Sequence, residues 1–205
     1  MTKEELKAFS DEIGQLFNDG KILCPVHLSY GNEEQLLRIF EKVSQNDWIL
    51  STWRSHSHYL CSGRDKEELK KQIMEGHSMH IFGHRFYTSA IVGGIAPIAV
   101  GIGYALKQKK DKSLVWCFLG DMGASTGIAM ESIRYACGND LPVRFVIEDN
   151  QLSVKTKTRE CWGCTKCEHG LRDRFLFSCD LYDCDNVRYY RYERVKPHAG
   201  NGGLF

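Results

Sequence analysis

Residues 114–150 carry the pattern that most restricts the fold. A short apolar run from Leu114 to Leu119 follows a charged turn and is typical of a buried strand. A turn over 120–123 comes next, then a helical segment from Ala124 to Cys137 and a second apolar strand from Val143 to Ile147. Two buried strands joined through a helix form a parallel unit with a right-handed crossover. The pattern therefore predicts an α/β fold with a mostly parallel sheet and helices on both faces.

Polar residues follow both predicted strands. Asp121 follows the first strand and Asn150 the second, with 28 residues between them. Because parallel strands place their carboxyl ends at one edge of the sheet, where ligands bind in such folds, we expect both side chains at that edge. Their oxygens are ligands that Mg²⁺ or Ca²⁺ prefers, and the N-terminus of the helix from Ala124 favours a phosphate. The alternative is that Asp121 only caps the helix and Asn150 only forms a turn.

The composition excludes several classes of protein. The 205 residues carry 27 Lys and Arg against 26 Asp and Glu, so no basic excess points to nucleic acid. Residues 86–106 are uncharged, but their four glycines and Pro97 argue against a membrane span. Residues 1–5 are polar, unlike a signal peptide, so we expect a cytoplasmic protein whose nine cysteines are reduced thiols.

The rest of the chain is expected to be mostly helical in its first half. Apolar residues at helical spacing predict helices over 2–18, 32–46, 65–76 and 90–107. Residues 48–63 and 77–89 have no clear period and are expected to be irregular, and further strands are expected near 175–178 and 186–192. We expect one domain over 1–205, with an N-terminal helical segment at 1–47 and a cysteine-rich loop at 155–170.

That loop contains three cysteines separated by two residues each: Cys161, Cys164 and Cys167. At this spacing all three can face one ion, and His169, Cys179 or Cys184 could complete a structural Zn²⁺ site. An iron–sulfur cluster is disfavoured, because the downstream Cys-Pro of the ferredoxin pattern is absent. Three free thiols are the other interpretation, and the spacing alone does not decide between them and zinc.

Gly120-Asp121 followed by Asn150 resembles the thiamine diphosphate motif, in which Gly-Asp-Gly opens and Asn closes. Three further segments resemble the alpha subunit of the decarboxylating component of 2-oxo acid dehydrogenases, of the pyruvate and acetoin dehydrogenase type. They are Thr52–His58, similar to the family's Tyr-Arg-x-His-Gly; Ser78–His80, similar to Gly-Ser-Met-His; and Ala90–Gly101, similar to Gly-Ile-Val-Gly. Order and spacing agree from about residue 32 to residue 160. The resemblance implies a three-layer, transketolase-like thiamine diphosphate-binding fold, here a single domain that binds the diphosphate and its metal.

The resemblance also assigns roles to matching positions. Asp121, Asn150 and the Leu152 carbonyl would bind Mg²⁺ or Ca²⁺. The positions that would bind the cofactor are Trp53, Arg54, Ala90, Val92, Gly120, Asp121, Gly123, Ala124 and Asn150. Trp53 and Arg54 would contact the diphosphate, Gly120 and Gly123 would shape the loop beneath it, and the backbone of Ala90 and Val92 would meet the aminopyrimidine.

Histidines are the candidates for the reaction side. By resemblance His56 and His80 would line it, and each is otherwise explained as a polar loop residue. The sequence departs from the family in two respects: Met122 replaces the second glycine of Gly-Asp-Gly, and the long phosphate-binding loop with its His has no clear match. His198 is the candidate for that missing His.

The resemblance implies a partner and a reaction. The family's activating Glu belongs to a separate pyrimidine-binding domain, so a beta-type subunit in a heterotetramer is expected. Together they would decarboxylate a 2-oxo acid and transfer the resulting acyl group. One alternative is a transketolase-like or acyloin-forming ligase acting on a ketose or related substrate, and another is a non-catalytic scaffold stapled by zinc.

Overall fold

The computed structural model describes residues 1–163 and 186–196, which fall into two compact units. The first unit comprises residues 1–45 and 51–90 together with the described residues from 192 on. The second comprises residues 46–50 and 91–191, again where they are described. The first unit is therefore assembled from segments that lie on both sides of the second along the chain.

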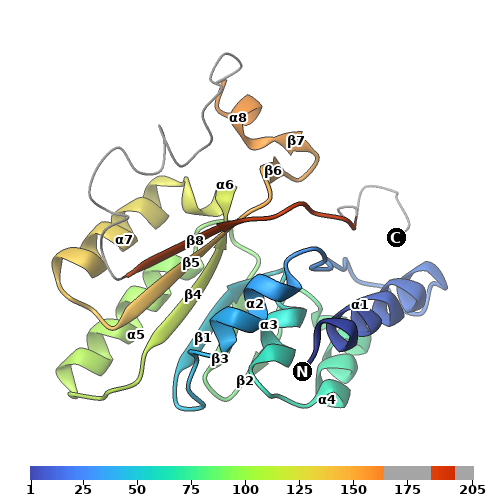
Figure 1. Cartoon of the computed structure of the whole chain (residues 1–205), viewed down its shortest axis with the longest axis horizontal. Coiled ribbons are helices and arrows are strands. Elements are labelled where there is room, and N and C mark those ends of the chain that lie inside the picture. Colours follow the sequence, from blue (N-terminus) through green and yellow to red (C-terminus); the bar gives the residue numbers. More distant parts are fainter. Residues whose placement is uncertain (164–185, 197–205) are drawn as a thin grey trace. The chain divides into compact units, whose positions relative to one another are not determined.

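The second unit is built on parallel strands that run in the order β1-β4-β5-β8 (Figure 1). Their bounds are β1 (Trp48–Thr52), β4 (Val115–Gly120), β5 (Val143–Asp149) and β8 (Val187–Arg191). In register, Leu50 lies opposite Cys117, Cys117 opposite Phe145, and Phe145 opposite Val187. The expected α/β class with a mostly parallel sheet is confirmed, and it is consistent with the three-layer architecture that the resemblance implies.

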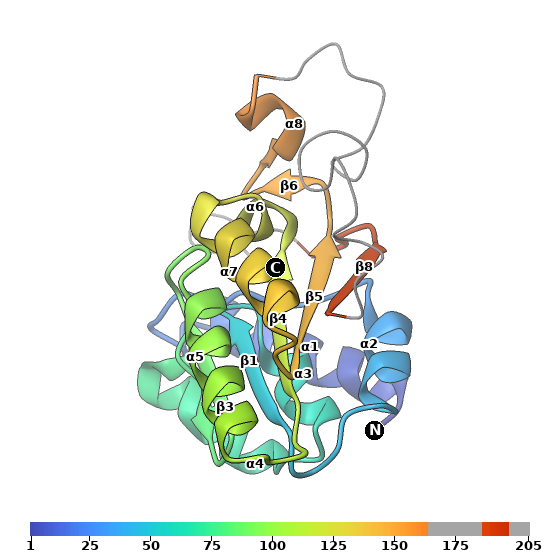
Figure 2. The same cartoon turned by 90° about the vertical axis from the view of Figure 1, so that its left-hand side faces the viewer.

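Two helices, α5 (Ile95–Gln108) and α7 (Gly127–Gly138), pack side by side against β4 and β5 (Figure 2). The buried apolar residues between them include Ala99, Ile133 and Phe145. At Gly103 of α5 an added Cβ would lie 2.4 Å from Val143 Cγ2, so only glycine allows this close approach of helix to sheet. This packing holds the carboxyl ends of β4 and β5 in place.

Short elements follow those carboxyl ends. They are α6 (Asp121–Ala124), the antiparallel pair β6 (Leu152–Ser153) and β7 (Thr156–Lys157), and α8 (Thr158–Cys161). Figure 2 shows β5 pointing towards β6, with α6 beside its end and α8 beyond. Contacts of α6 with β5 and β6 bring the residues after both strands to one edge of the sheet.

The first unit is mainly helical. Its elements are α1 (Lys3–Asn18), α2 (Glu33–Phe40), α3 (His56–Cys61), α4 (Lys66–Gln72), the π-helix η1 (Ile73–His77) and the hairpin of β2 (Phe82–Gly83) with β3 (Phe86–Ser89). Helix α1 begins with a capping box between Thr2 and Glu5, and it buries Leu6, Phe9 and Ile13 at helical spacing.

The structure corrects several predicted boundaries. The region 48–63 is not irregular, because it contains β1 and α3, and the expected loop over 77–89 contains the β2–β3 hairpin. Helix α2 ends at Phe40 rather than 46. The helix expected over 90–107 begins only at Ile95, because Gly93 before it has a left-handed backbone with φ of 74°. The expected strand near 175–178 lies outside the described residues.

Candidate metal centre

Asp121 is the first residue of α6, directly after β4, and its carboxylate is buried with 2% of its surface exposed. Thr158 donates a hydrogen bond from its hydroxyl to Oδ2 of Asp121. Burial, together with the negative charge of Asp149, raises the pKa of Asp121 to about 7, although the Thr158 hydrogen bond lowers it. A carboxyl in such a place is stabilised in its charged form by a cation.

Asn150 follows β5, and its Oδ1 accepts a hydrogen bond of 2.9 Å from the backbone N–H of Leu152. This turn brings the Leu152 backbone back beside the end of β5. Since α6 contacts β5 and β6, the structure brings Asp121, Asn150 and Leu152 together within the second unit. Carboxylate, amide and carbonyl oxygens form the all-oxygen donor set that suits Mg²⁺ or Ca²⁺, so the residues present fit a divalent cation.

A second carboxylate at this edge, Asp149, was missed by the sequence analysis. It is completely buried, and its Oδ1 accepts a hydrogen bond of 2.8 Å from the N–H of Gln151. Its Oδ2 accepts the hydroxyl hydrogen of Tyr189 and lies 3.5 Å from Nε of Arg191. The available signal was its position, since Asp149 ends a buried strand and directly precedes Asn150.

The turn between β4 and α7 meets a glycine-containing loop. Gly93 lies so close to it that an added Cβ would be 2.4 Å from Thr126 Oγ1, and a Cβ on Gly123 would be 3.8 Å from the Gly93 nitrogen. Thr126 caps α7 by accepting from Ala129 N–H. The helix expected to begin at Ala124 therefore begins at Gly127, after a separate turn, and Val92 next to Gly93 belongs to a loop beside this turn.

The remaining residues of the turn fit their places. Gly120 has open space around its Cα hydrogens, and Ala124 is buried in the core of the unit. Met122, which replaces the second glycine of the motif, is half-buried in a helical turn and has no left-handed backbone. The backbone here does not require glycine, so the departure leaves the position of Asp121 intact.

Trp53 and Arg54 lie in the first unit, after β1. The guanidinium of Arg54 donates to the Leu28 carbonyl, and the Trp53 ring meets the ring of His27 edge-on at a centroid distance of 6.2 Å. His27 was also missed by the sequence analysis, although it lies in the connection between the first two helices and is buried with 7% exposure. The structure thus groups Trp53, Arg54 and His27 on the segments that flank α2.

The predicted histidines occupy different environments in the first unit. His56 is buried, and its Nε2 lies 3.1 Å from Ser78 Oγ, while its Nδ1 has no hydrogen-bond partner among the described residues. Burial lowers the pKa of His56 to about 4. His58 is also buried and pairs with Ser51 Oγ at 2.7 Å. His80 is exposed in the turn after η1, and Ala90 directly follows β3.

The other predicted site residues are only partly within the described chain. His198, Cys164 and Cys167 lie outside the described residues. Cys161 is an exposed free thiol at the end of α8. Within residues 1–163 and 186–196, no three His, Cys, Asp or Glu side chains gather as a metal-binding group. Cys24 and Cys117 are also free thiols, whereas Cys137 is disulfide-bonded, so the expectation of nine reduced thiols is wrong for Cys137.

The glycines and Pro97 of residues 86–106 argue against a membrane span. None of the helices in the described part of the chain combines the length and the apolar character needed to cross a bilayer.

Comparison with known proteins relates this geometry to one family. The pyruvate dehydrogenase E1 component subunit alpha of Rickettsia prowazekii (strain Madrid E) is 28% identical over 189 residues, which cover 86% of this chain and 54% of the relative. The alpha subunit of acetoin:2,6-dichlorophenolindophenol oxidoreductase from Bacillus subtilis (strain 168) is 31% identical over 172 residues, covering 78% of this chain and 52% of the relative. The chain thus spans about half the length of these curated relatives.

A solved structure and a family model complete the comparison. A crystal structure from Mycobacterium smegmatis, described as a thiamin diphosphate-dependent enzyme, matches 63% of this chain and 23% of its own chain, with a TM-score of 0.41 and 14% identity. The model of the family described as dehydrogenase E1 component matches residues 1–170, which include Asp121, Asn150 and Leu152 of the candidate metal centre. The chain is a member of the dehydrogenase E1 component family.

Proposed function

We propose that the chain is the alpha-type subunit of a two-subunit thiamine diphosphate enzyme. Asp121, Asn150 and the Leu152 carbonyl hold Mg²⁺ or Ca²⁺, which in turn binds the diphosphate of the cofactor. The observation that carries the proposal is the buried Asp121 carboxyl at the carboxyl end of β4, beside the turn formed by Asn150. Burial of this carboxylate in its charged form is unfavourable, and a bound divalent cation reverses that cost.

The other residues of the proposed site act on the rest of the cofactor. Each unit carries residues that we assign to the cofactor: the turn over 120–124 and Val92 in the second unit, and Trp53, Arg54 and Ala90 in the first. The turn over 120–124 and the residues Trp53 and Arg54 are assigned to the diphosphate, and the backbone of Ala90 and Val92 to the aminopyrimidine. Thiamine diphosphate, when bound, supplies the electron sink for breaking a bond next to a carbonyl carbon. The protein contributes binding, orientation and exclusion of water, with His56, His80 and His198 on the reaction side.

The partner and the reaction follow from family membership. The curated relatives are named as alpha subunits, and this chain spans about half of their length. We infer a beta-type subunit that supplies a pyrimidine-binding domain, in a heterotetramer, and a 2-oxo acid whose acyl group is transferred after decarboxylation. Acetoin is the second candidate substrate, because the relative with 31% identity carries acetoin in its name.

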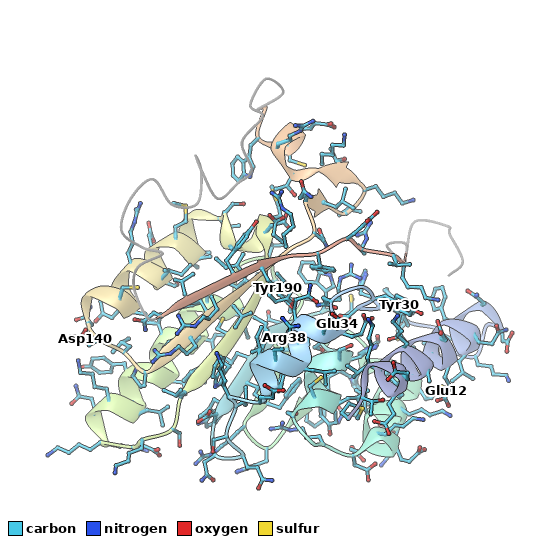
Figure 3. The ribbon with its side chains drawn as sticks, in the orientation of Figure 1. Glu12, Tyr30, Glu34, Arg38, Asp140 and Tyr190 are labelled. Carbon is cyan, nitrogen blue, oxygen red and sulfur yellow. The ribbon has the colours of Figure 1, made fainter. Side chains whose placement is uncertain are left out.

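Calorimetric titration with thiamine diphosphate and Mg²⁺ tests the proposal. The chain is titrated alone and then with a beta-type subunit, and the Asp121→Ala and Asn150→Ala variants are titrated beside it. We expect binding by the wild type that tightens with the partner and falls at least 100-fold in either variant. Asp140→Asn is the matched control, since Asp140 is an exposed carboxylate of the same unit (Figure 3).

The outcomes separate the alternatives. Wild-type binding that is retained in Asp140→Asn and lost in Asp121→Ala supports the metal-bridged site. No binding by the wild type under either condition overturns the proposed function. Equal binding by wild type and Asp121→Ala overturns the assignment of the metal ligand.

A further inference from the structure

Two side chains of β8 contact Asp149, the residue directly before the proposed metal ligand Asn150. Asp149 lies opposite Arg191 in the β5–β8 register, and Ile147 lies opposite Tyr189. Because alternate residues of a strand share a face, Tyr189 and Arg191 lie on the same face of β8. The hydroxyl of Tyr189 and Nε of Arg191 both approach Oδ2 of Asp149. A completely buried carboxylate is thereby fixed from the neighbouring strand.

The other oxygen of Asp149 shapes the loop that follows. Oδ1 accepts from the N–H of Gln151, and Oδ1 of Asn150 accepts from the N–H of Leu152, so two successive side chains form two successive turns. Gln151 adopts a left-handed backbone with φ of 59°, which is unfavourable for a residue with a side chain. Its carbonyl is held by the N–H of Thr158 at 2.9 Å. The bond to Asp149 therefore helps to maintain a loop conformation that Gln151 does not favour by itself.

The charge of Asp149 also reaches the proposed metal centre. Gly120 lies opposite Glu148 in the β4–β5 register, so Asp121 and Asp149, the residues that follow them, lie next to each other at the same edge of the sheet. A divalent cation bound by Asp121 and Asn150 would be attracted by this second negative charge, and the attraction is strong in a buried site. The hydrogen bond from Gln151 to Asp149 and the negative charge of Asp149 would therefore both favour binding of the cation.

We propose that Asp149 is a positioning residue for the divalent cation, and that Tyr189 and Arg191 of β8 hold it in place. Through the Gln151 amide, Asp149 sets the loop that presents Asn150 and the Leu152 carbonyl to the metal. The inference rests on the proposed function, because it assumes a cation at Asp121 and Asn150. It assigns a role to β8, a strand that contributes no ligand.

Tyr189→Phe is the most specific variant, since it removes one hydroxyl and keeps the ring. Tyr190→Phe is its matched control, because Tyr190 donates the same kind of bond to Glu148 from the other face of the strand (Figure 3). Mn²⁺ replaces Mg²⁺ as the probe, and its binding in the presence of thiamine diphosphate, and of the beta-type subunit where this tightens binding, is followed by electron paramagnetic resonance.

We expect Tyr189→Phe to weaken Mn²⁺ binding about tenfold and to change the spectrum of the bound ion. Tyr190→Phe is expected to leave both the affinity and the spectrum unchanged, with similar melting temperatures for the two metal-free variants. Unchanged Mn²⁺ binding in Tyr189→Phe, or equal weakening in both variants, overturns the positioning role. A wild type that binds no Mn²⁺ overturns the proposed function instead, so the two failures are distinguishable.

Two variants of Asp149 itself provide a rescue test. Asp149→Asn keeps an oxygen that can accept from Gln151 N–H, whereas Asp149→Ala removes it. We expect Mn²⁺ binding to be weakened in both and to be clearly stronger in Asp149→Asn than in Asp149→Ala. Equal binding in the two variants would overturn the role of the Gln151 bond.

Discussion

The two units bury ionisable side chains in different ways. In the first unit, His56 is buried as a neutral imidazole, and burial lowers its pKa to about 4. In the second unit, Asp121 is buried beside Asp149, and burial raises its pKa to about 7. Both shifts favour the neutral form, but near neutral pH His56 is neutral, whereas Asp121 is about half ionised. A buried histidine can therefore be part of a stable core at neutral pH, while a buried aspartate carries an unfavourable charge unless a cation compensates it.

The largest expected effect is on the metal-free protein at Asp121. The pKa of Asp121 is about 7 in the folded state, against an ordinary value of 3.8, so the folded state binds more protons between pH 3.8 and 7 than the unfolded state does. Stability is then expected to fall as pH rises from about 4 to 7. Asp121→Asn should remove this dependence and raise the free energy of unfolding at pH 8, without metal, by on the order of 2–4 kcal/mol.

Chemical denaturation at pH 5 and pH 8, with Mg²⁺ removed, measures this effect. Asp140→Asn makes the same chemical change at an exposed site and is expected to leave the pH dependence as in the wild type. If the free energy of unfolding changed between pH 5 and pH 8 by the same amount in the wild type and in Asp121→Asn, the contrast between the two units would be contradicted.

His56 should show the opposite slope. The folded pKa of His56, about 4, lies below its ordinary value of 6.5, so the unfolded state binds more protons between pH 4 and 6.5. The stability contribution is full above pH 6.5 and is lost as pH falls towards 4, by about 3 kcal/mol. His56→Gln should flatten the stability profile between pH 4 and 6.5, whereas His84→Gln, at an exposed histidine, should not. Identical profiles for the two variants would break the comparison.

Gly93→Ala tests the effect of packing on the stability of the second unit without changing a charge. The new Cβ would meet Thr126 Oγ1 at 2.4 Å on a backbone with φ of 74°, so we expect a loss of about 2–3 kcal/mol. The loss should be the same at pH 5 and pH 8, unlike the effect of Asp121→Asn. Gly20→Ala has a similar φ of 69° but open space around it, and should lose less. If Gly93→Ala and Gly20→Ala lost equal free energy of unfolding in denaturation experiments, the new Cβ at position 93 would not overlap with Thr126.

The smallest effect is expected for exposed charges. Glu12 of α1 lies 3.3 Å from Lys66 and also pairs with Lys70 of α4, and these contacts lower its pKa (Figure 3). Because water and salt screen such pairs, Glu12→Gln should change the melting temperature by about 2 °C or less. Differential scanning calorimetry at low and high salt measures this change. If Glu12→Gln shifted the melting temperature as much as His56→Gln does, burial would not be what distinguishes the buried ionisable residues from the surface ion pairs.

The sequence was sufficient where periodicity and strand ends determine the structure. The apolar runs predicted β4 and β5 to within two residues at either end, and the position of Asp121 and Asn150 after them predicted a shared edge of the sheet. It was insufficient for β1, because Ser51 and Thr52 are polar residues buried within the strand. Burial of Ser51 depends on its bond to His58 in α3, and no local pattern reports such a pairing.

The environment of Asp149 could not be predicted from the sequence either, because it also depends on a long-range pairing. Its partner Tyr189 is 40 residues away along the chain, and the two meet only through the register of β5 and β8. The helix boundaries at Ile95 and Gly127 depended on a left-handed glycine and on a threonine cap, which hydrophobic spacing does not reveal. Local sequence thus predicted that Asp121 and Asn150 share one edge of the sheet, and long-range pairing determined what lies around them.

The way the chain returns to its first unit has a consequence for synthesis. Val195 N–H donates to the Tyr30 carbonyl at 3.3 Å, Lys196 pairs with Asp11 at 2.7 Å, and Gly31 leaves room for the Glu193 carbonyl. On the ribosome, residues 11–31 emerge long before residues 193–196, with all of the second unit made in between. These contacts of residues 11–31 can therefore form only after residues 193–196 have been made, and a chain terminated before them would leave that surface uncovered.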